Sequence, residues 1–339
     1  MSADLTLPQE RANQVGRAEA EASLRAAMGE GALSHGWIVA GPKGAGKATL
    51  AYRIARGLLD PSALTGEKSF DMPETARAFR LIAQGAHPDL FVAERAWNEK
   101  TSKYQTEITV ETIRALTLFL NRTAAMGGAR VAIIDTADDL NRNAANALLK
   151  ALEEPPANTL LLLLSEAPGR LLATIRSRCR RLDLRPVPDA EIFALLEQEE
   201  LAEGSNAAQI AAHASGRPGY ALSLAAGDGA EAISLAARFL SEARGAGDIS
   251  RIAQALAGKA GDEKWEIFRT IVIRDLSDAA RAAAGGREVE GPLQGLTPAA
   301  ILNAYEQLSS LAVRGEGLNL DRIQLITAMA YDLRRALAA

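Results

Sequence analysis

The sequence H-G-W-I-V-A-G-P-K-G-A-G-K-A-T-L-A at residues 35–51 combines a strand, a glycine loop and a helix in one short segment. The run at 37–40 is short, unbroken and apolar, which is typical of a buried strand. The loop G-P-K-G-A-G-K follows at 41–47, and apolar residues then recur at every fourth position from Leu50 to Leu58, which predicts a helix. This order is the arrangement of a P-loop, in which a strand leads through glycines into a helix.

Further segments extend this unit into an α/β domain. The apolar runs at 131–134 and 160–164 are short and unbroken, the pattern of parallel strands that are covered on both faces. A helical pattern from about 139 to 153 lies between them, so the three segments predict a βαβ unit. Helices are also predicted at 14–34 and 107–120.

The rest of the chain shows different patterns. Residues 60–89 lack clear periodicity and are predicted to be a surface insertion. Beyond Pro186 and Pro188 there is no strong strand candidate, only Ala- and Leu-rich helical segments separated by glycines. The predicted boundaries give a parallel-sheet α/β domain at 1–185, a small helical domain at 186–238 and an all-α domain at 239–339.

Composition and charge narrow the classes of function. Of the 339 residues, 48% are hydrophobic and 24% are charged, which is enough material for several cores. A net charge of −4 and a pI near 5.6 give no overall attraction to a phosphate backbone, which argues against binding of free nucleic acid. Cys179 is the single cysteine, so an internal disulfide and a four-cysteine zinc site are excluded. No segment approaches the ~20 apolar residues of a membrane span, so we expect a cytoplasmic protein without a membrane role.

The glycine loop predicts a phosphate site. Its backbone N–H groups and the dipole of the next helix would point at phosphate, with Lys47 reaching the β and γ oxygens. The motif then requires a Ser or Thr to hold Mg²⁺, but Ala48 stands there and Thr49 is rotated by about 100° around the helix. Either phosphate binds without good hydrolysis, or the loop is only a tight strand-to-helix turn. The candidate residues are Gly41, Gly44, Gly46, Lys47 and Thr49.

Asp135 follows the strand at 131–134, where P-loop proteins place the acid that helps to hold Mg²⁺. Hydrolysing members with an Asp-Glu pair place a glutamate next, as the base that activates the attacking water, but Thr136 cannot act as a base at neutral pH. The chemical step therefore lacks its base. A structural role for Asp135, as a cap of the following turn, is equally open. Asp138 and Asp139 are expected to face solvent.

An arginine-rich segment, L-L-A-T-I-R-S-R-C-R-R at 171–181, is the third chemical feature. The guanidinium group is planar and permanently charged, and as a finger offered to a neighbour's nucleotide it can be worth ~10³ to 10⁵ in rate. A solvated basic turn is the alternative. With the residue just before the segment, the cluster consists of Arg170, Arg176, Arg178, Arg180 and Arg181.

Several motifs together resemble a known family. They are the segment at 35–51, A-H-P-D-L at 86–90, N-R-N-A-A-N-A-L-L-K at 141–150, A-L-L-K-A-L-E-E-P-P-A at 147–157 and T-I-R-S-R-C at 174–179. With these motifs the chain resembles clamp-loader subunits of the AAA+ class, and among them the delta-prime subunits of bacterial DNA polymerase III. The resemblance covers roughly residues 14–225. It implies a RecA-like AAA+ domain, then a helical lid domain and a C-terminal helical collar for oligomerisation, although the last third matches only in length and helical character.

The resemblance also implies roles for individual residues. The family's Ser-Arg-Cys motif falls on Ser177, Arg178 and Cys179, which implies that Arg178 contacts ATP bound in an adjacent motor subunit. The first sensor of the family falls on Ser165. The second-sensor arginine of motor subunits falls on Gly219.

Four departures from the motor subunits agree with one another: Ala48, Thr136, Gly219 and the absence of the four cysteines of a zinc module. They imply a stator that binds ATP or ADP without efficient hydrolysis, and no zinc. The resemblance implies a heteropentamer with motor (gamma/tau) and delta subunits that loads the sliding clamp on primed DNA, within a polymerase holoenzyme in which this chain is neither polymerase nor competent ATPase. An ATP-hydrolysing motor subunit and an unrelated P-loop small-molecule kinase are the alternatives.

Overall fold

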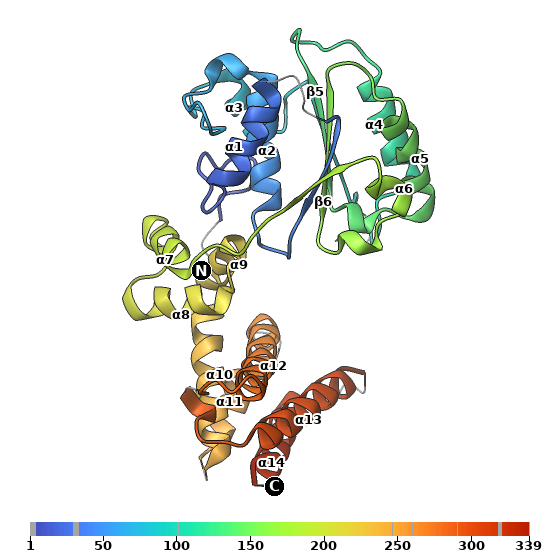
Figure 1. The fold of residues 1–339 in the computed structure, drawn as a ribbon. Coiled ribbons are helices and arrows are strands. Elements are labelled where there is room, and N and C mark those ends of the chain that lie inside the picture. Colours follow the sequence, from blue (N-terminus) through green and yellow to red (C-terminus); the bar gives the residue numbers. More distant parts are fainter. Residues whose placement is uncertain are drawn as a thin grey trace. The chain divides into compact units, whose positions relative to one another are not determined.

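The protein is described by a computed structural model that covers residues 5–29, 34–99, 102–245, 247–258, 261–289, 291–317 and 321–338. Figure 1 shows the course of the chain. In these ranges no helix is both long and apolar enough to cross a membrane.

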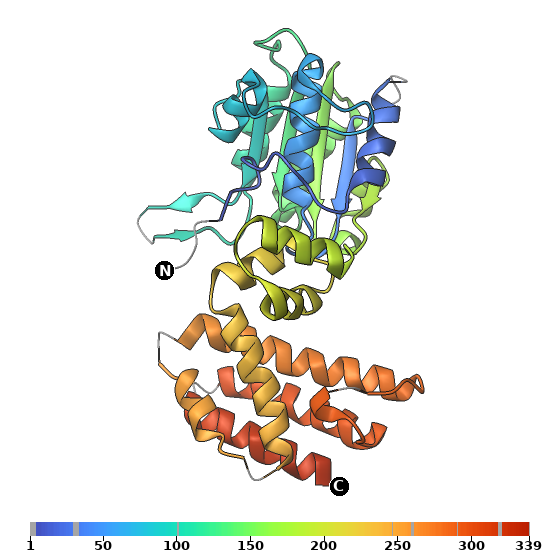
Figure 2. The same cartoon turned by 90° about the vertical axis from the view of Figure 1, so that its left-hand side faces the viewer.

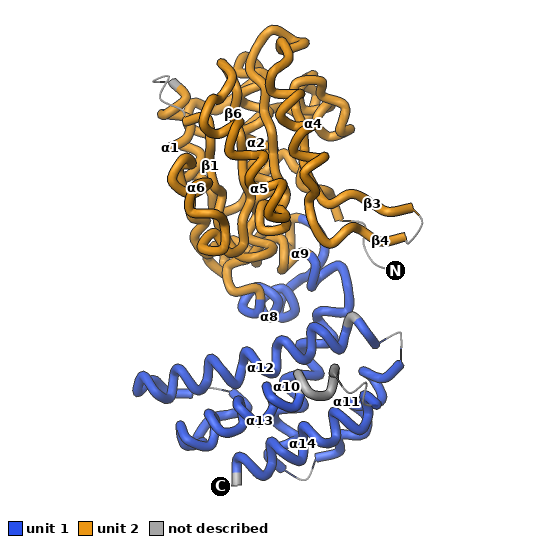
Figure 3. Tube along the Cα trace, turned by 90° about the vertical axis from the view of Figure 1, so that its right-hand side faces the viewer, with its two compact units in different colours: residues 1–3, 199–213, 223–339 blue, residues 4–198, 214–222 orange. Residues whose placement is uncertain are grey.

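The chain divides into two units (Figure 3). The P-loop unit comprises Asp4–Gln198 and Ala214–Leu222, and the C-terminal unit comprises Glu199–His213 and Ser223–Ala339.

Five parallel strands form the sheet of the P-loop unit, in the order β2-β5-β6-β1-β7 (Figure 2). Every residue of β1 (Gly36–Ala40) and β6 (Thr159–Ser165) is buried, as are all but the last of β5 (Arg130–Asp135). Central parallel strands covered on both faces need such continuous apolar runs. The predicted parallel sheet is confirmed, and its three central strands lie where the apolar runs placed them.

Two strands of this sheet were not predicted. β2 (Leu90–Glu94) directly follows the segment predicted as an insertion and pairs with β5. β7 (Arg180–Asp183) begins at the end of the arginine-rich segment and pairs with β1. Both are outer strands, and β7 has no fully buried residue. β7 carries no unbroken apolar run, so the pattern that identified the central strands was absent there. β2 does begin with an apolar run at 90–93, so its signal was present in the sequence. A short hairpin of β3 (Trp97–Asn98) and β4 (Lys103–Tyr104) follows β2.

Helices cover both faces of the sheet (Figure 1). Alternate residues of β1 face opposite sides, so Ile38 packs with the α4 and α5 side chains and Val39 with those of α2. The helix predicted at 14–34 is shorter than expected. On one face lie α1 (Ala18–Gly29), α2 (Lys47–Leu59) and α3 (Arg77–Ala83), and on the other α4 (Val110–Leu120), α5 (Arg142–Glu153) and α6 (Ala173–Arg176); α7 (Asp189–Gln198) and the short turns η1 (Pro61–Ala63), η2 (Ala137–Asp139) and η3 (Pro168–Arg170) complete the elements up to residue 198.

The second half of the chain is helical in the described residues, as predicted. Phe239 and Phe268 meet edge to face at 5.4 Å where α10 packs on α12. The predicted boundary at 238 falls inside α10, and the three-part domain division stays a prediction. The helices are α8 (Gly204–Ala214), α9 (Pro218–Ala226), α10 (Gly229–Arg244), α11 (Ser250–Ala255), α12 (Asp262–Ala284), α13 (Pro298–Gly317) and α14 (Arg322–Ala338), with the turn η5 (Gly291–Leu293).

Candidate functional site

The glycine loop connects the end of β1 to the first residue of α2, which is Lys47. Gly44 and Gly46 have φ angles of 80° and 88°, in the left-handed region that favours glycine. The Gly41 N–H donates to the Ser165 carbonyl over 3.1 Å, which ties the loop to the end of β6. The loop therefore presents a helix N-terminus and its free N–H groups at the carboxyl edge of the sheet, the usual position of a phosphate site.

Lys47 is buried and folded back on its own loop. Its Nζ donates to the carbonyls of Gly41 and Pro42 over 2.8 and 3.1 Å and lies 3.7 Å from Glu166 Oε1. Burial lowers the pKa of Lys47, and the carboxylates of Glu166 and Asp135 act in the opposite direction. A phosphate group would have to replace these oxygens, so Glu166 competes with it for the cation.

A cavity of about 500 Å³ lies beside the loop. Two of the predicted residues, Gly41 and Ser165, are not among the described residues that line it. Ala48, Thr136 and Glu166 do line it. The structure therefore brings together five of the seven predicted nucleotide residues: Gly44, Gly46, Lys47, Thr49 and Asp135.

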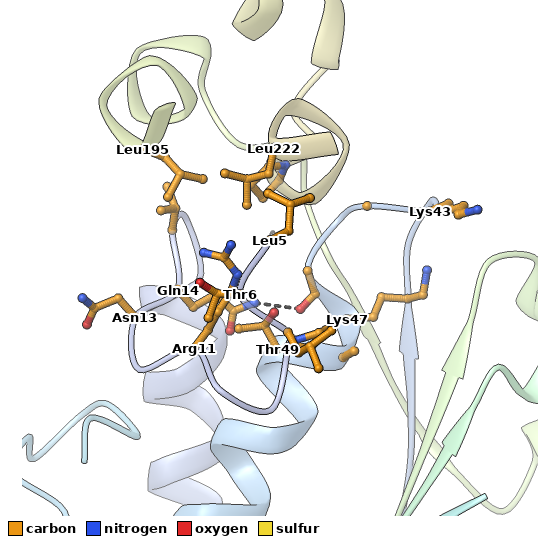
Figure 4. A pocket seen from close by; sticks show the side chains of 18 of the residues that line it. Leu5, Thr6, Arg11, Asn13, Gln14, Lys43, Lys47, Thr49, Leu195 and Leu222 are labelled. Carbon is orange, nitrogen blue, oxygen red and sulfur yellow. Dashed lines mark hydrogen bonds between the residues drawn. The ribbon is translucent and has the colours of Figure 1, made fainter. Parts of the chain in front are cut away.

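The cavity has a polar side and an apolar side. Figure 4 shows Lys47 and Thr49 on the loop side, with Leu195 and Leu222 across from them and Leu5 near Leu222. An apolar wall suits a nucleobase, and the loop with its lysine suits phosphates.

The residues that would support metal-assisted hydrolysis are incomplete. Burial raises the pKa of Asp135, with Lys47 acting in the opposite direction, and the Thr136 hydroxyl donates to Asp135 Oδ1 over 3.4 Å. Ala48 contributes no oxygen. Among the residues that the structure describes, no three His, Cys, Asp or Glu side chains gather to hold a metal ion. The glycine loop and Lys47 suit the phosphates of a nucleotide, but Ala48 does not provide the usual hydroxyl ligand of Mg²⁺.

Asp138 is not a solvent-facing residue, which corrects the prediction. Its carboxylate accepts hydrogen bonds from the Ser165 hydroxyl at 3.0 Å and from the N–H groups of Glu166 and Ala167 at 2.7 and 3.1 Å. Ser165 is fully buried, and its hydroxyl donates to Asp138 and does not face the cavity. The next residue, Glu166, lines the cavity in place of Ser165. Asp139 pairs with Arg95 at 3.2 Å.

The segment before α1, residues 5–17, forms a strap over the glycine loop. The Gln14 side chain donates to the Gly46 carbonyl over 2.8 Å (dashed in Figure 4). Arg17 is buried and donates to the Ala45 carbonyl over 2.7 Å and to the Arg185 carbonyl over 2.6 Å. The strap therefore holds the loop through the carbonyl groups of Ala45 and Gly46, and strap residues also line the cavity.

Two buried arginines of α2 anchor the same strap. Arg56 donates to the Arg11 carbonyl over 2.7 Å and also to the Gln9 carbonyl, and Arg53 donates to the Ala12 carbonyl. The strap was not predicted as part of the site, because it has no periodicity of its own. The available signal was the pair of arginines three positions apart in a helix whose other positions are largely apolar.

The first turn of α9 lies directly on the glycine loop. The Gly219 N–H donates to the Gly44 carbonyl over 2.8 Å. A Cβ on Gly44 would lie 2.6 Å from the Tyr220 nitrogen, and one on Gly219 would lie 3.1 Å from the Gly44 oxygen. Backbone contact thus occupies the position where the resemblance places the second-sensor arginine of motor subunits. Arg217 stacks on the Tyr220 ring at 4.2 Å and is not among the described lining residues.

Arg178 lies outside the lining of this cavity. It follows α6, with Nη2 at 2.8 Å from Glu153 Oε1 at the end of α5 and Nη1 donating to the Thr174 carbonyl over 3.0 Å. Its side chain is 35% exposed. Cys179 packs against β1, because a Cβ on Gly36 would lie 3.1 Å from its sulfur. The Ser177 hydroxyl also donates to Thr174 O.

The rest of the arginine cluster is varied. Arg176 donates to the carbonyls of Gly169 and Leu171, and Arg181 pairs with Asp183 at 2.6 Å. Arg180 lies 5.7 Å from the centre of the Trp37 ring. The two backbone contacts give Arg176 a structural role. Arg180 and Arg181 are exposed, which suits a surface that contacts either solvent or another chain.

Comparison with known proteins gives consistent matches. The family model described as "DNA polymerase III, delta subunit" matches residues 16–188. The chain is 40% identical over 150 residues to DNA polymerase III subunit delta′ of Pseudomonas aeruginosa, covering 43% of this chain and 42% of that protein. It is 32% identical over 268 residues to subunit delta′ of Escherichia coli, covering 79% and 75%. It is 31% identical over 232 residues to subunit tau of Salmonella typhimurium, covering 66% and 34%. The match thus spans under half of the Pseudomonas protein and three quarters of the E. coli protein.

Proposed function

Because the chain belongs to the family of DNA polymerase III delta′ subunits, we propose that it is a non-hydrolysing clamp-loader subunit that offers Arg178 to ATP held by a neighbouring subunit. The observation that carries this proposal is a contrast between two places in one unit. The cavity beside Lys47 fits a nucleotide but lacks groups for its hydrolysis, while an accessible arginine lies outside that cavity.

Three features argue against hydrolysis at this chain's own cavity. Ala48 has no hydroxyl for Mg²⁺, and Thr136 is no general base. Glu166 places negative charge 3.7 Å from the loop lysine, where it would repel a γ-phosphate. ATP or ADP would therefore be held by Lys47 and the loop N–H groups without efficient turnover.

The surroundings of Arg178 support a role toward another chain. Its partner Glu153 is 50% exposed, and an ion pair this open is worth only about 0–1 kcal/mol. Exchange of Glu153 for a phosphate would thus cost little. The packing of Cys179 on β1 holds the backbone next to Arg178, and the Nη1 bond to Thr174 O holds the guanidinium in a defined starting position.

The partners follow from this role. We infer motor subunits of the gamma/tau type and a delta subunit as neighbours, and the sliding clamp and primed DNA as the targets of the assembly in the cytoplasm. The contact between Gly44 and Gly219 suits a stator, because a backbone hydrogen bond holds the first turn of α9 on the glycine loop.

The test uses a loader reconstituted from this chain and its cognate motor and delta subunits. Arg178→Ala should lower DNA- and clamp-stimulated ATPase turnover by about ten-fold or more, which is roughly 1.4 kcal/mol of barrier. Arg181→Ala is the matched control, because Arg181 lies in the same cluster and also forms an ion pair. Size-exclusion chromatography checks assembly. Unchanged turnover in an intact complex would refute the role of Arg178.

An ATP-hydrolysing motor subunit is the second candidate, and the retained lysine, the cavity and the similarity to a tau subunit favour it. That function requires ATPase activity of the isolated chain that is lost in Lys47→Ala. Absence of such activity, with ATP binding retained, supports the stator. The family relationship leaves no observation in favour of a small-molecule kinase.

A further inference from the structure

A second cavity, of about 330 Å³, lies on α12 and α13 of the C-terminal unit. Its lining includes Arg269, Arg274 and Arg281 from α12, and hydroxyl groups from Thr270 and Ser277 of α12 and Tyr305 of α13. Thr270, Arg274, Ser277 and Arg281 recur at intervals of three or four residues, so they share one face of the helix. No carboxylate is among the described lining residues. The Thr270 hydroxyl donates to the Glu266 carbonyl over 2.8 Å, which leaves the Ser277 and Tyr305 hydroxyls as donors. Three guanidinium groups and these two hydroxyls form a surface suited to an oxyanion.

The arginines differ in how firmly they are held. Arg274 donates to the His213 carbonyl and lies 3.3 Å from Asp275, so it is a fixed part of the wall. Arg281 is 72% exposed, donates to the Ser277 hydroxyl over 2.9 Å and lies 3.4 Å from Asp278. The hydroxyl orients this guanidinium toward the cavity that both residues line.

Acidic residues flank these arginines without lining the cavity. Glu266 lies 2.7 Å from Arg269, and it and Asp278 are 57% and 56% exposed. Ion pairs of this exposure are worth about 0–1 kcal/mol, so a stronger acceptor can displace them. A phosphate with two negative charges and three acceptor oxygens is such an acceptor, because arginine binds it in a bidentate manner.

We propose that this cavity is a binding site for a phosphate group. Arg269 and Arg281 supply the bidentate contacts, Arg274 supplies fixed positive charge, and the Tyr305 hydroxyl donates to a remaining oxygen. The phosphate is either a small free anion or one group of a single-stranded DNA backbone. The proposal concerns the C-terminal unit alone and does not depend on the role of Arg178.

The experiment is isothermal titration of the full chain with inorganic phosphate and, separately, with an oligothymidylate about ten nucleotides long, at constant ionic strength. Arg269→Gln with Arg281→Gln should weaken binding by about ten-fold or more, since two charge-assisted contacts are lost. Arg238→Gln is the matched control, because Arg238 forms a similar ion pair with Glu242 on α10. Lys47→Ala removes binding at the glycine loop and should leave this component unchanged.

Each outcome decides between the possibilities. Arginine-dependent binding of phosphate without the oligonucleotide identifies a small-anion site. Arginine-dependent binding of the oligonucleotide, with or without free phosphate, identifies a DNA backbone contact. Binding that survives the double variant, that disappears in Lys47→Ala, or that is absent for both probes overturns the proposal. Circular dichroism verifies the fold of the variants, and Arg281→Gln alone replaces the double variant should it fail to fold.

Discussion

Replacing Arg53 by methionine should destabilise the P-loop unit by about 3–5 kcal/mol, the usual cost of removing one partner of a buried ion pair. Arg53 is 2% exposed and donates to both oxygens of Glu21, over 2.6 and 3.0 Å, and to Asp71 over 2.6 Å. It also donates to the carbonyl of Ala12 in the strap. The methionine would leave Glu21, itself 4% exposed, with the Phe70 N–H at 3.0 Å as its remaining partner in the described structure.

The magnitude can be separated into its parts by a second substitution. Glu21→Gln keeps an oxygen for the Phe70 N–H but removes the buried charge. Arg53→Met with Glu21→Gln should therefore be more stable than Arg53→Met alone by at least about 1 kcal/mol, because no uncompensated charge remains in the core. Arg238→Met, which breaks an exposed pair, should cost under about 1 kcal/mol.

Urea denaturation followed by circular dichroism and tryptophan fluorescence measures these differences, with separate transitions fitted for the two units. A loss below about 1 kcal/mol in Arg53→Met would show that water reaches Glu21 and that the pair is not buried in solution. A double variant no more stable than the single one would refute the claim that the uncompensated charge dominates the loss.

The remaining predictions concern the glycine loop, Asp135 and Cys179. Gly44→Ala should lower the free energy of unfolding by about 1–3 kcal/mol, because the residue has φ of 80° and the added carbon would lie 2.6 Å from the Tyr220 nitrogen. Gly219→Ala should lower it less in the same urea assay. Equal losses for the two variants would contradict the contact between Gly44 and α9. Asp135→Asn should raise the free energy of unfolding at pH 7. Burial raises the pKa of the Asp135 carboxyl above its unfolded value, so ionisation of this group destabilises the folded chain as pH rises through the folded pKa. The gain in stability from the asparagine should vanish below about pH 4, where the carboxyl is protonated in both states. A variant less stable at pH 7 would show that the ionised carboxyl is well compensated. Burial raises the pKa of Cys179 to about 11, which at pH 8 lowers its thiolate fraction about a hundredfold. A disulfide reagent should therefore modify Cys179 slowly in the folded chain and faster once urea unfolds it. Equal rates of modification in the folded and unfolded chain would disprove this prediction.

The centre of the fold was predictable because its physical signals are local. The apolar runs of β1, β5 and β6 mark strands buried on both faces, and glycines with φ near 80–90° mark the loop between β1 and α2. The outer strand β2 carried the same signal in its apolar run at 90–93, but the outer strand β7 did not. Within β7 only Leu182 is partly buried, so its identity as a strand depends on pairing with β1, which a local pattern does not contain.

The site was predictable in its residue types but not in all of its contacts. Lys47 and Asp135 line the cavity as expected. Ser165 is the last residue of β6 and Glu166 follows it. Successive side chains along an extended chain point in opposite directions, so only one of the two can face the cavity. The residue that lines the cavity is Glu166, one position after the predicted Ser165. The strap depends on Arg53 and Arg56, whose carbonyl partners are more than 40 residues away in sequence.

The position of β7 gives the arginine cluster a consequence unrelated to nucleotides. β7 is the outermost strand on its side of the sheet, so one of its backbone edges has no partner strand among the described residues. Such an edge is a template for pairing with another chain, and natural sheets prevent this with short strands and charged side chains. β7 has four residues, and Arg180 and Arg181 are both exposed. Replacing both by valine would therefore turn this edge into a site of strand addition and aggregation, even in a chain that still folds.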